Sequence, residues 1–308
     1  MSEQPERIPD RDELDTEFAV IGSYRTHKAA HDAGLSVLAG GQAYWVRKEG
    51  DRFLLIVPRS EAQRLLREVR LSERLNRFWP PRRLVLADRS VSKLPCIAAL
   101  GCLVTLFALQ NQFPWLQEQG ANASRALQEG GQWWRVFTAM TLHADLGHLA
   151  GNLMGLSLFS YLCARYLGNG LAWLLIVLAA AASNATNGLL ASSLDYRSLG
   201  ASTAVFAALG LLSGFPVGSF LRSRNPIRSR DWLVPFFGGC TLFAWMGGGE
   251  FPTDVPAHLW AFLFGSLGSM AAAGFDWQNK LGPRWQTALL ATALILVGSS
   301  WCLAFASR

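Results

Sequence analysis

A serine and a histidine near the starts of two apolar segments could together perform nucleophilic chemistry. Ser202 opens an apolar run that extends to residue 220, and His258 lies three residues into another run, 255–274. A histidine that accepts the hydroxyl proton converts a serine into a nucleophile. Taken alone, Ser202 is better explained as a packing serine that bonds back to its own helix. The interpretation therefore depends on the polar residues that accompany the pair.

Two more histidines and an asparagine could provide hydrogen-bond donors to the same site. His148 and Asn152 are four residues apart in the run 146–167 and share one helix face, and His143 precedes them in a loop. Donors of this kind stabilise an oxyanion. His148 and Asn152 could instead form a clamp between helices. The three histidines could also bind zinc, but no His-Glu-x-x-His motif or cysteine ligand supports that role.

Carboxylates are absent from the apolar runs, because Asp145, Asp195 and Asp254 all fall in the connections. A third group that orients the histidine is not evident, so a Ser–His dyad is expected instead of a triad. Alternatively, His258 could be a buried structural histidine whose ring nitrogens form hydrogen bonds with neighbouring residues and take no part in catalysis.

Seven apolar runs must position these residues, and the chain is expected to be an all-α polytopic membrane protein. A helix of about 20 apolar residues crosses a bilayer, and each run reaches or nearly reaches that length. The chain is 51% hydrophobic, and more than half of its charged residues lie in the first 90 positions. The runs are 94–110, 146–167, 171–191, 202–220, 232–248, 255–274 and 285–306.

The basic residues of the connections predict the orientation. Eleven Arg and Lys residues lie in the connections on one side of the predicted bundle and four on the other. The positive-inside rule then places the N-terminus in the cytoplasm and the C-terminus outside. Ser202, His258, His148 and Asn152 all fall at the outer ends of their runs. The net charge of +6 is explained by these connections and does not indicate nucleic-acid binding.

The N-terminal part reads as a small soluble α/β domain. Residues 1–16 are polar, with no apolar segment of a signal peptide, and are expected to be disordered. Residues 17–80 predict a βαββα order, with Ser60 as the N-cap of a helix over 61–78. A basic linker, 81–93, follows. His27 and His31 share a helix face but lack a third ligand, so neither a metal nor a cofactor is expected there.

Cysteines and a long connection complete the pattern. The five cysteines all lie in apolar runs and their number is odd, which favours buried packing thiols over disulfides.

The connection 111–145 contains Trp115, Trp133 and Trp134, which suit an interfacial segment. A loop of this length in a compact bundle is more often functional than a plain amphipathic connector.

These motifs resemble the rhomboid intramembrane serine proteases over residues 91 to 275. The resemblance implies a six-helix membrane core, 94–275, with an additional C-terminal transmembrane helix, 276–308. The small head is similar in outline to the cytoplasmic domain of some bacterial members, which implies a bacterial cell (inner) membrane. The matching pieces are Trp134-Arg135, His143-x4-His148-x3-Asn152, Gly200-x-Ser202, and Ala257-His258 with Gly265 seven residues on.

The resemblance also implies roles for these residues. Ser202 corresponds to the nucleophile and His258 to its base. His148, Asn152 and the Ser202 backbone N–H correspond to the oxyanion hole, and Phe206 to an aromatic that packs on the histidine. Substrates would be single-span transmembrane proteins in membrane lipid, with no cofactor, metal or nucleic acid. The residues expected to support the site are His143, Trp134, Arg135 and Gly200.

Three positions depart from the family pattern. Thr203 replaces a glycine after the serine, which would narrow the approach of a substrate backbone. Ala261 replaces a glycine three residues after the histidine. Ala164 or a neighbour replaces a glutamate that braces the first outer loop.

Two other functions are considered beside the protease. The second hypothesis, which Thr203 supports, is a rhomboid-like protein that binds transmembrane clients without cutting them. The third is a small transporter with a polar site in its helix bundle. Reaction with a fluorophosphonate serine probe is expected only of the protease.

Overall fold

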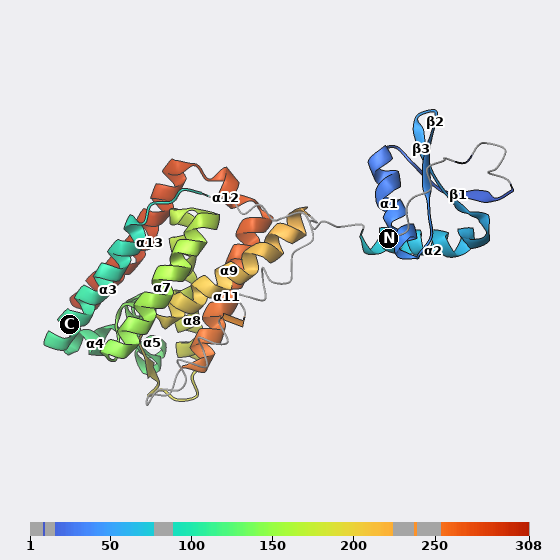
Figure 1. Cartoon of the computed structure of the whole chain (residues 1–308). Coiled ribbons are helices and arrows are strands. Elements are labelled where there is room, and N and C mark those ends of the chain that lie inside the picture. The colour runs from blue at the N-terminus through green and yellow to red at the C-terminus, as the bar shows by residue number, and fades with distance from the viewer. Residues whose placement is uncertain (1–8, 10–15, 77–88, 224–236, 239–253, 308) are drawn as a thin grey trace. The chain divides into compact units, whose positions relative to one another are not determined.

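The chain forms two compact units, residues 1–82 and 83–308, which are described separately (Figure 1). The structure, a computed structural model, describes residues 9, 16–76, 89–223, 237–238 and 254–307. The larger unit is helical, and the smaller one is built on a three-stranded sheet. The predicted fold class is confirmed.

The small unit has the predicted βαββα order. The third strand lies between the other two and pairs antiparallel with both. Leu55 and Val57 of this strand pack with Val37, Leu65 and Val69 of the two helices to form the core. The elements are β1 (Phe18–Tyr24), α1 (His27–Ala39), β2 (Trp45–Glu49), β3 (Arg52–Pro58) and α2 (Ala62–Leu75).

The predicted helix start at Ser60 is wrong. The chain leaves β3 through a 3-10 turn, Arg59–Glu61, so Ser60 already lies within helical backbone. The cap of α2 is Glu61, and no side chain closes it. The helix α1 does have a side-chain cap, because Thr26 accepts a hydrogen bond from the Ala29 amide.

The described part of the membrane unit contains six long helices. Five of them are long and apolar enough to span a bilayer. The sixth, α7, has the length but is less apolar, because it carries His148, Asn152 and Arg165. The predicted run 232–248 lies outside the described residues. The helices are α3 (Leu94–Gln112), α7 (Leu146–Leu167), α8 (Asn169–Leu190), α9 (Ser202–Ser223), α11 (Val255–Gly274) and α13 (Pro283–Ala306).

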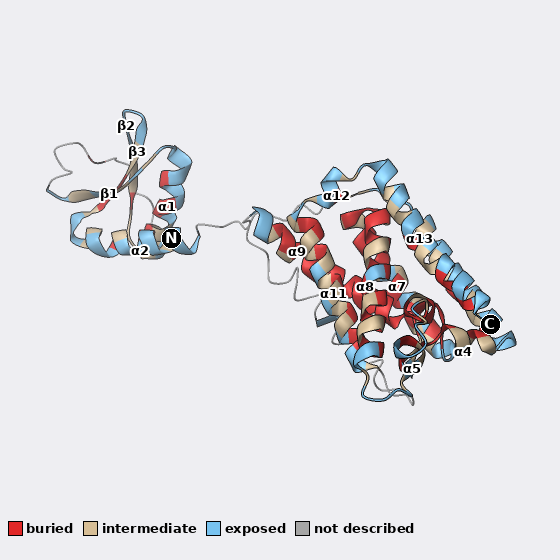
Figure 2. Cartoon of the chain, turned by 180° about the vertical axis from the view of Figure 1, so that it is seen from behind, coloured by how far each residue is buried: buried red, intermediate tan, exposed pale blue. Residues whose placement is uncertain are grey.

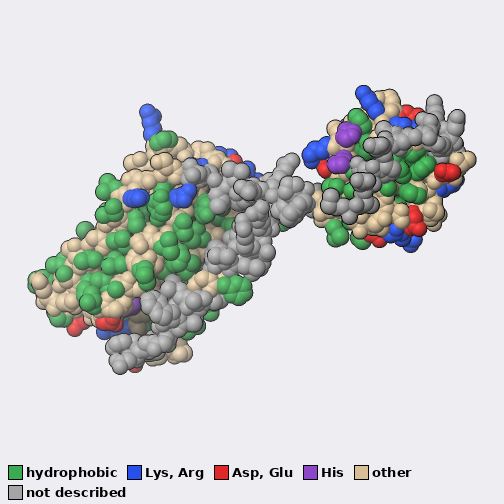
Figure 3. Space-filling model, in the orientation of Figure 1, with side chains coloured by type: hydrophobic (Ala, Val, Ile, Leu, Met, Phe, Trp, Pro, Cys, Tyr) green, Lys and Arg blue, Asp and Glu red, His purple; other side chains and the backbone are tan. Residues whose placement is uncertain are grey.

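Apolar side chains are spread over the outer surface of this unit, as one face shows in green in Figure 3. Exposed leucines and isoleucines recur on the long helices, as expected of surfaces that face lipid. The protein is thus an integral membrane protein.

The expectation of buried thiols holds only for Cys163 among the four described cysteines. Cys96 is half-buried, and Cys102 and Cys302 are exposed, because their helices turn them toward the bilayer. Cys240 lies outside the described residues.

Helix α9 is the central element, and nearly all of its residues are buried (Figure 2). It packs most extensively against α11. The contact is a glycine seam, formed by Gly210, Gly214 and Gly218 of α9 and Gly265 of α11. A methyl group at any of the four would overlap a backbone carbonyl of the facing helix. Small residues of this kind let helix backbones touch in a membrane.

The connection between α3 and α7 is folded over the ends of these helices. It ends beside the segment that precedes α9, and its strand β4 pairs with β5 of that segment. The described connection after α11 contains the short α12 (Trp277–Lys280). The elements between α3 and α7 are α4 (Trp115–Gly120), β4 (Asn122–Ala123), α5 (Ser124–Gln128), α6 (Arg135–Thr138) and the 3-10 turn η3 (Ala139–Thr141), and β5 is Arg197–Ser198.

Candidate active site

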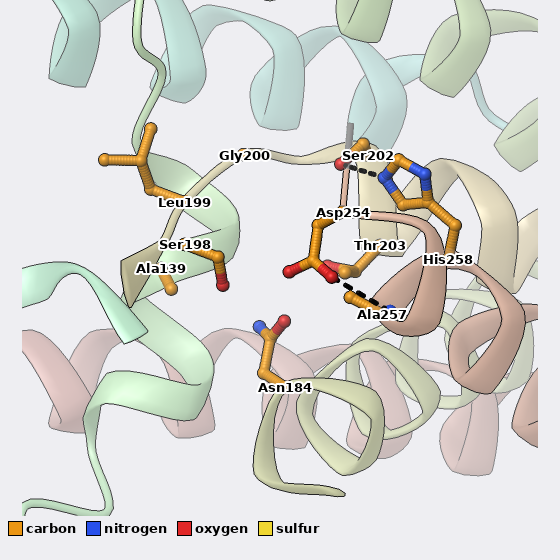
Figure 4. A pocket seen from close by; sticks show the side chains of 10 residues that line it. All are labelled: Ala139, Asn184, Ser198, Leu199, Gly200, Ser202, Thr203, Asp254, Ala257 and His258. Carbon is orange, nitrogen blue, oxygen red and sulfur yellow. Dashed lines mark hydrogen bonds between the residues drawn. The ribbon is translucent and has the colours of Figure 1, made fainter. Parts of the chain in front are cut away.

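Ser202 and His258 meet at the first turns of α9 and α11. The Oγ of Ser202 lies 2.8 Å from the Nε2 of His258, and both side chains are buried (Figure 4). The glycine seam fixes this distance, since it holds the two helix backbones in contact along their length. Such a separation allows a proton to pass from the hydroxyl to the imidazole.

Gly200 gives the backbone before Ser202 its shape. Its φ is +138°, which L side chains rarely adopt, and its amide donates to the Ala139 carbonyl at 2.9 Å. A Cβ at this position would also overlap the imidazole of His148, at 2.6 Å from Cε1. His148 therefore lies directly against the backbone that leads to Ser202. A glycine is required here both for its conformation and for the space.

Phe206 lies one turn after Ser202 and covers one face of the His258 imidazole. The two rings are stacked, with centroids 4.4 Å apart and planes 14° apart. The stacking limits rotation of the imidazole about its side-chain bonds, so Nε2 stays directed at the serine.

Asn152 lies one turn after His148 on α7 and is fully buried. Neither its Nδ2 nor its Oδ1 has a hydrogen-bond partner in the described part of the chain. An unpaired buried amide costs about 1–3 kcal/mol, so its retention calls for an explanation. An amide donor left free for a substrate oxygen is one such explanation.

His143 supports the segment before Ser202 from the other side. The Ala201 amide lies 3.5 Å from its Nε2, and its ring meets that of His148 edge to face at 5.3 Å. Burial, and then the neighbouring His148, lower the pKa of His143 to about 3, against the opposing effect of Asp145. The imidazole is therefore neutral. Gln110 of α3, which the sequence did not single out, bonds both the amide and the carbonyl of His143.

Trp134 and Arg135 hold the outer connection together. Arg135 is buried and donates from Nη1 to the carbonyls of Glu118 at 2.7 Å and Ala121 at 2.8 Å. Burial, and then Arg197, lower its pKa to about 10. Trp134 donates from Nε1 to the Gln119 carbonyl at 3.4 Å. These two residues stabilise the connection and do not touch Ser202.

Residues 130–275 match the family model of the Rhomboid domain. This part of the chain is therefore similar to a rhomboid domain. Two curated relatives, both from Bacillus subtilis (strain 168), agree with this assignment. Rhomboid protease GluP is 39% identical over 82 residues, which is 27% of this chain and 16% of the relative. Putative rhomboid protease YdcA is 35% identical over 81 residues, which is 26% of this chain and 40% of the relative. The chain thus matches less than half the length of either relative.

Asp254 lies beside the candidate site, although the sequence placed it only in a connection. It caps α11 by accepting from the Ala257 amide at 3.3 Å. Its carboxylate also accepts hydrogen bonds from Asn187 of α8, at 2.9 Å, and from the Tyr196 hydroxyl. Burial, and then the Asp254 carboxylate, raise the pKa of Tyr196. Asp254 ties the turn that carries His258 to the segment that leads to Ser202.

A pocket opens beside Ser202 and His258. It contains about 250 Å³ of empty space, part of it open to solvent, and Ser202, His258 and Asp254 line it. Figure 4 shows the side chains of Asn184, Ser198 and Asp254 directed toward the same space. Thr203 also lines it, and its hydroxyl is buried without a partner in the described chain. The threonine therefore takes up space in the pocket beside Ser202.

Proposed function

We propose that this protein is an intramembrane serine endopeptidase in which Ser202 is the nucleophile and His258 the base. The observation that carries the proposal is the 2.8 Å separation of Ser202 Oγ and His258 Nε2 in a buried site between two tightly packed helices. The names of the two relatives, rhomboid protease and putative rhomboid protease, support the same activity.

The proposed reaction has two stages. In the first, Ser202 Oγ attacks the scissile carbonyl carbon while His258 Nε2 takes the hydroxyl proton. The imidazolium then gives this proton to the leaving amine, which leaves an acyl-enzyme. In the second stage His258 takes a proton from water, the hydroxide attacks the ester carbonyl, and Ser202 recovers its proton as the acid is released.

The developing oxyanion would be held by the amide of Asn152, the imidazole of His148 and the backbone N–H of Ser202. The buried, unpartnered amide of Asn152 supports this assignment, as does the position of His148 against Gly200. Donors fixed in a site with little water stabilise such a charge strongly. The pocket beside the dyad, which is partly open to solvent and lined by Asn184, Ser198 and Asp254 among others, is suited to admit the water of the second stage.

Substrates would be single-span transmembrane proteins, cut near the outer membrane face. Small residues in a substrate helix would lower the cost of unwinding it, because unpaired backbone groups are expensive in lipid. The basic connections favour a cytoplasmic N-terminus and an outer C-terminus in a bacterial inner membrane. The proposed division is a disordered 1–16, a cytoplasmic domain 17–80, a linker 81–93, a core 94–275 and a further helix 276–308.

Reconstituted protein incubated with a panel of labile single-span helices tests this function. We expect cleavage by the wild type, no cleavage by Ser202→Ala, and fluorophosphonate labelling that depends on Ser202. Equal cleavage by the Ser202→Ala variant would refute the proposal.

Thr203 favours a second candidate, a rhomboid-like protein that binds transmembrane clients without cutting them. Its side chain lines the pocket where a glycine would leave more space for a substrate backbone. Stable capture of a single-span helix with no cleavage and no probe labelling, unchanged in Thr203→Gly, would support this candidate over the protease.

A further inference from the structure

The C-terminal helix α13 reaches the segments that hold the candidate site. Trp301, near the end of this helix, is buried and donates its indole N–H to the Thr141 hydroxyl at 3.1 Å. The Thr141 hydroxyl donates in turn to the Thr138 carbonyl at 2.7 Å. Trp301 is therefore bonded to the 3-10 turn η3 and, through it, to the end of α6.

The same 3-10 turn holds the backbone that precedes Ser202. Its first residue, Ala139, accepts the Gly200 amide at 2.9 Å. Two hydrogen bonds, one at each end of a three-residue turn, thus connect Trp301 of α13 to Gly200, two residues before Ser202.

An apolar cluster makes a second connection between α13 and the site. Its buried members are Leu116, Leu142, Trp301 and Ala304, and Leu199 packs against it. Leu142 immediately precedes His143, and Leu199 immediately precedes Gly200. Trp301 therefore packs in one cluster with the neighbours of two residues that surround the Ser202 backbone.

The fit around Trp301 leaves no spare space. A Cβ at Gly120 would lie 2.7 Å from the indole ring and 2.8 Å from Leu142. Phe305 extends the contact, with its ring 5.8 Å from that of Trp301 and 5.5 Å from that of Trp115. Because interiors packed this closely transmit displacement, loss of the indole would shift the turn that it supports.

The opposite end of α13 is fixed as well. Gln286 donates to the Leu167 carbonyl at 2.9 Å and accepts from the Leu171 amide at 3.1 Å, so it bonds both sides of the turn between α7 and α8. A Cβ at Gly170 would overlap the Gln286 backbone. With both ends tied to the core, α13 is held in one position against the bundle.

We infer that α13 is an integral part of the catalytic site, and that Trp301 is a positioning residue that holds the Gly200–Ser202 backbone and His143 in place. This inference rests on the proposed protease function. It gives the additional C-terminal helix a role that a lipid-facing anchor would not have.

Steady-state cleavage of one reconstituted single-span substrate tests the inference. Trp301→Phe keeps most of the packing but loses the N–H donor, and one neutral hydrogen bond corresponds to about a threefold to tenfold lower kcat. Trp301→Ala should lower kcat by about 10²-fold, because small displacements of reacting groups are that costly. KM should change little, since Trp301 is not expected to touch substrate. The matched control is Trp285→Ala, an exposed tryptophan on the same helix, which should retain wild-type kcat.

A second readout does not depend on activity. Hydrogen–deuterium exchange of the peptide that covers residues 196–206 should be faster in Trp301→Ala than in wild type and unchanged in Trp285→Ala. Faster exchange with lowered kcat supports the inference. Unchanged exchange with wild-type kcat in Trp301→Ala, beside an inactive Ser202→Ala, overturns the inference and leaves the protease function standing. Faster exchange in a protein whose Ser202→Ala variant cleaves normally would refute the protease function and retain the positioning contact.

Discussion

The phenyl ring of Phe206 lies parallel to the imidazole of His258, with the two ring centroids 4.4 Å apart. Phe206 lies in the second turn of α9 and His258 in the first turn of α11, so the stacking connects the starts of the two helices beside the Ser202 hydroxyl. An imidazole covered in this way keeps one orientation while its protonation changes.

Replacing Phe206 tests this contact. Phe206→Leu keeps an apolar side chain but loses the stacking, and aromatic pairs contribute about 0.5–1.5 kcal/mol beyond their buried area, so kcat should fall roughly threefold to tenfold. Phe206→Tyr should retain most activity. The control is Phe107→Leu, a half-buried phenylalanine on α3. Equal kinetics for the Phe206→Leu and Phe107→Leu variants would show that the stacking has no role in turnover.

The dyad and the oxyanion donors should respond differently to mutation. Ser202→Ala and His258→Ala should each abolish turnover, and the double variant should be no worse, because the two act as a unit. Asn152→Ala should lower kcat by about 10²–10³ and leave measurable activity, since one donor of several is lost. His148→Ala should be similar or somewhat worse. Cys163→Ser, on the far part of α7, should have little effect. A result in which Asn152→Ala is inactive and Ser202→Ala is not would reverse the proposed roles.

Asp254 should affect stability through its contacts with three elements. Asp254→Ala removes the cap of α11, worth about 0.5–2 kcal/mol. It also removes the carboxylate acceptor of Asn187 and Tyr196, which keep only the Tyr196 hydroxyl and the Ser198 hydroxyl as acceptors among the described residues. Thermal unfolding should begin at a lower temperature, and Asp254→Asn, which keeps one acceptor oxygen, should lose less. Asp195→Ala is the matched control, because that carboxylate is exposed and pairs with Arg125 in an exposed contact. The idea fails if the Asp254→Ala and Asp195→Ala variants unfold at the same temperature.

His143 should make the fold sensitive to acid. Its pKa is about 3 in the folded protein, against an ordinary value of 6.5, chiefly because it is buried. The unfolded chain therefore takes up a proton first as the pH falls. The contribution of His143 to the stability of the fold is complete above pH 6.5 and declines between 6.5 and about 3. The midpoint of thermal unfolding, followed by tryptophan fluorescence, should drop between pH 7 and pH 4.5, and less so in His143→Gln. Identical pH dependence in both proteins would argue against this origin.

Removal of residues 1–80 should leave proteolysis largely intact. The small unit has its own core, and no candidate catalytic residue comes from it. The measurement is cleavage of a single-span substrate by truncated and full-length protein in equal, correctly inserted amounts. If the truncated protein inserts and folds but does not cleave, the N-terminal unit has a role in catalysis that the site does not explain.

From the sequence, Ser202 could be paired with His258 because the hydropathy pattern predicts how deep each residue lies in the membrane. Helical periodicity then predicts which residues of a run share one helix face. The proposed chemistry also predicts that the outer ends of the runs 202–220 and 255–274 touch, and the small residues of the first run, including Gly210 and Gly214, indicate close helix contact. The structure confirms both, and it adds Gly218 and the facing Gly265 to the contact. Ser60 was wrongly predicted as a helix cap because capping rules consider only the residue type, and they do not predict that a 3-10 turn precedes the helix.

Long-range contacts explain the residues that were missed. Asp254 stands four residues before His258 at a helix start, a position typical of a cap, but its bonds to Asn187 and Tyr196 depend on the packing of α8. Gln110 and Trp301 reach the site from helices far away in the chain. Neither lies in a motif, so only the assembled bundle reveals them.

The glycine seam between α9 and α11 has a consequence for how a substrate could enter. With backbone against backbone, the two helices cannot separate or slide without losing contact along their whole shared length. Admission of a transmembrane segment must then displace other elements, while the distance between Ser202 and His258 stays the same. In the proposed mechanism Ser202 and His258 are already in place in the resting protein. The slow event in turnover is then expected to be the arrival and unwinding of the substrate, not the assembly of the dyad.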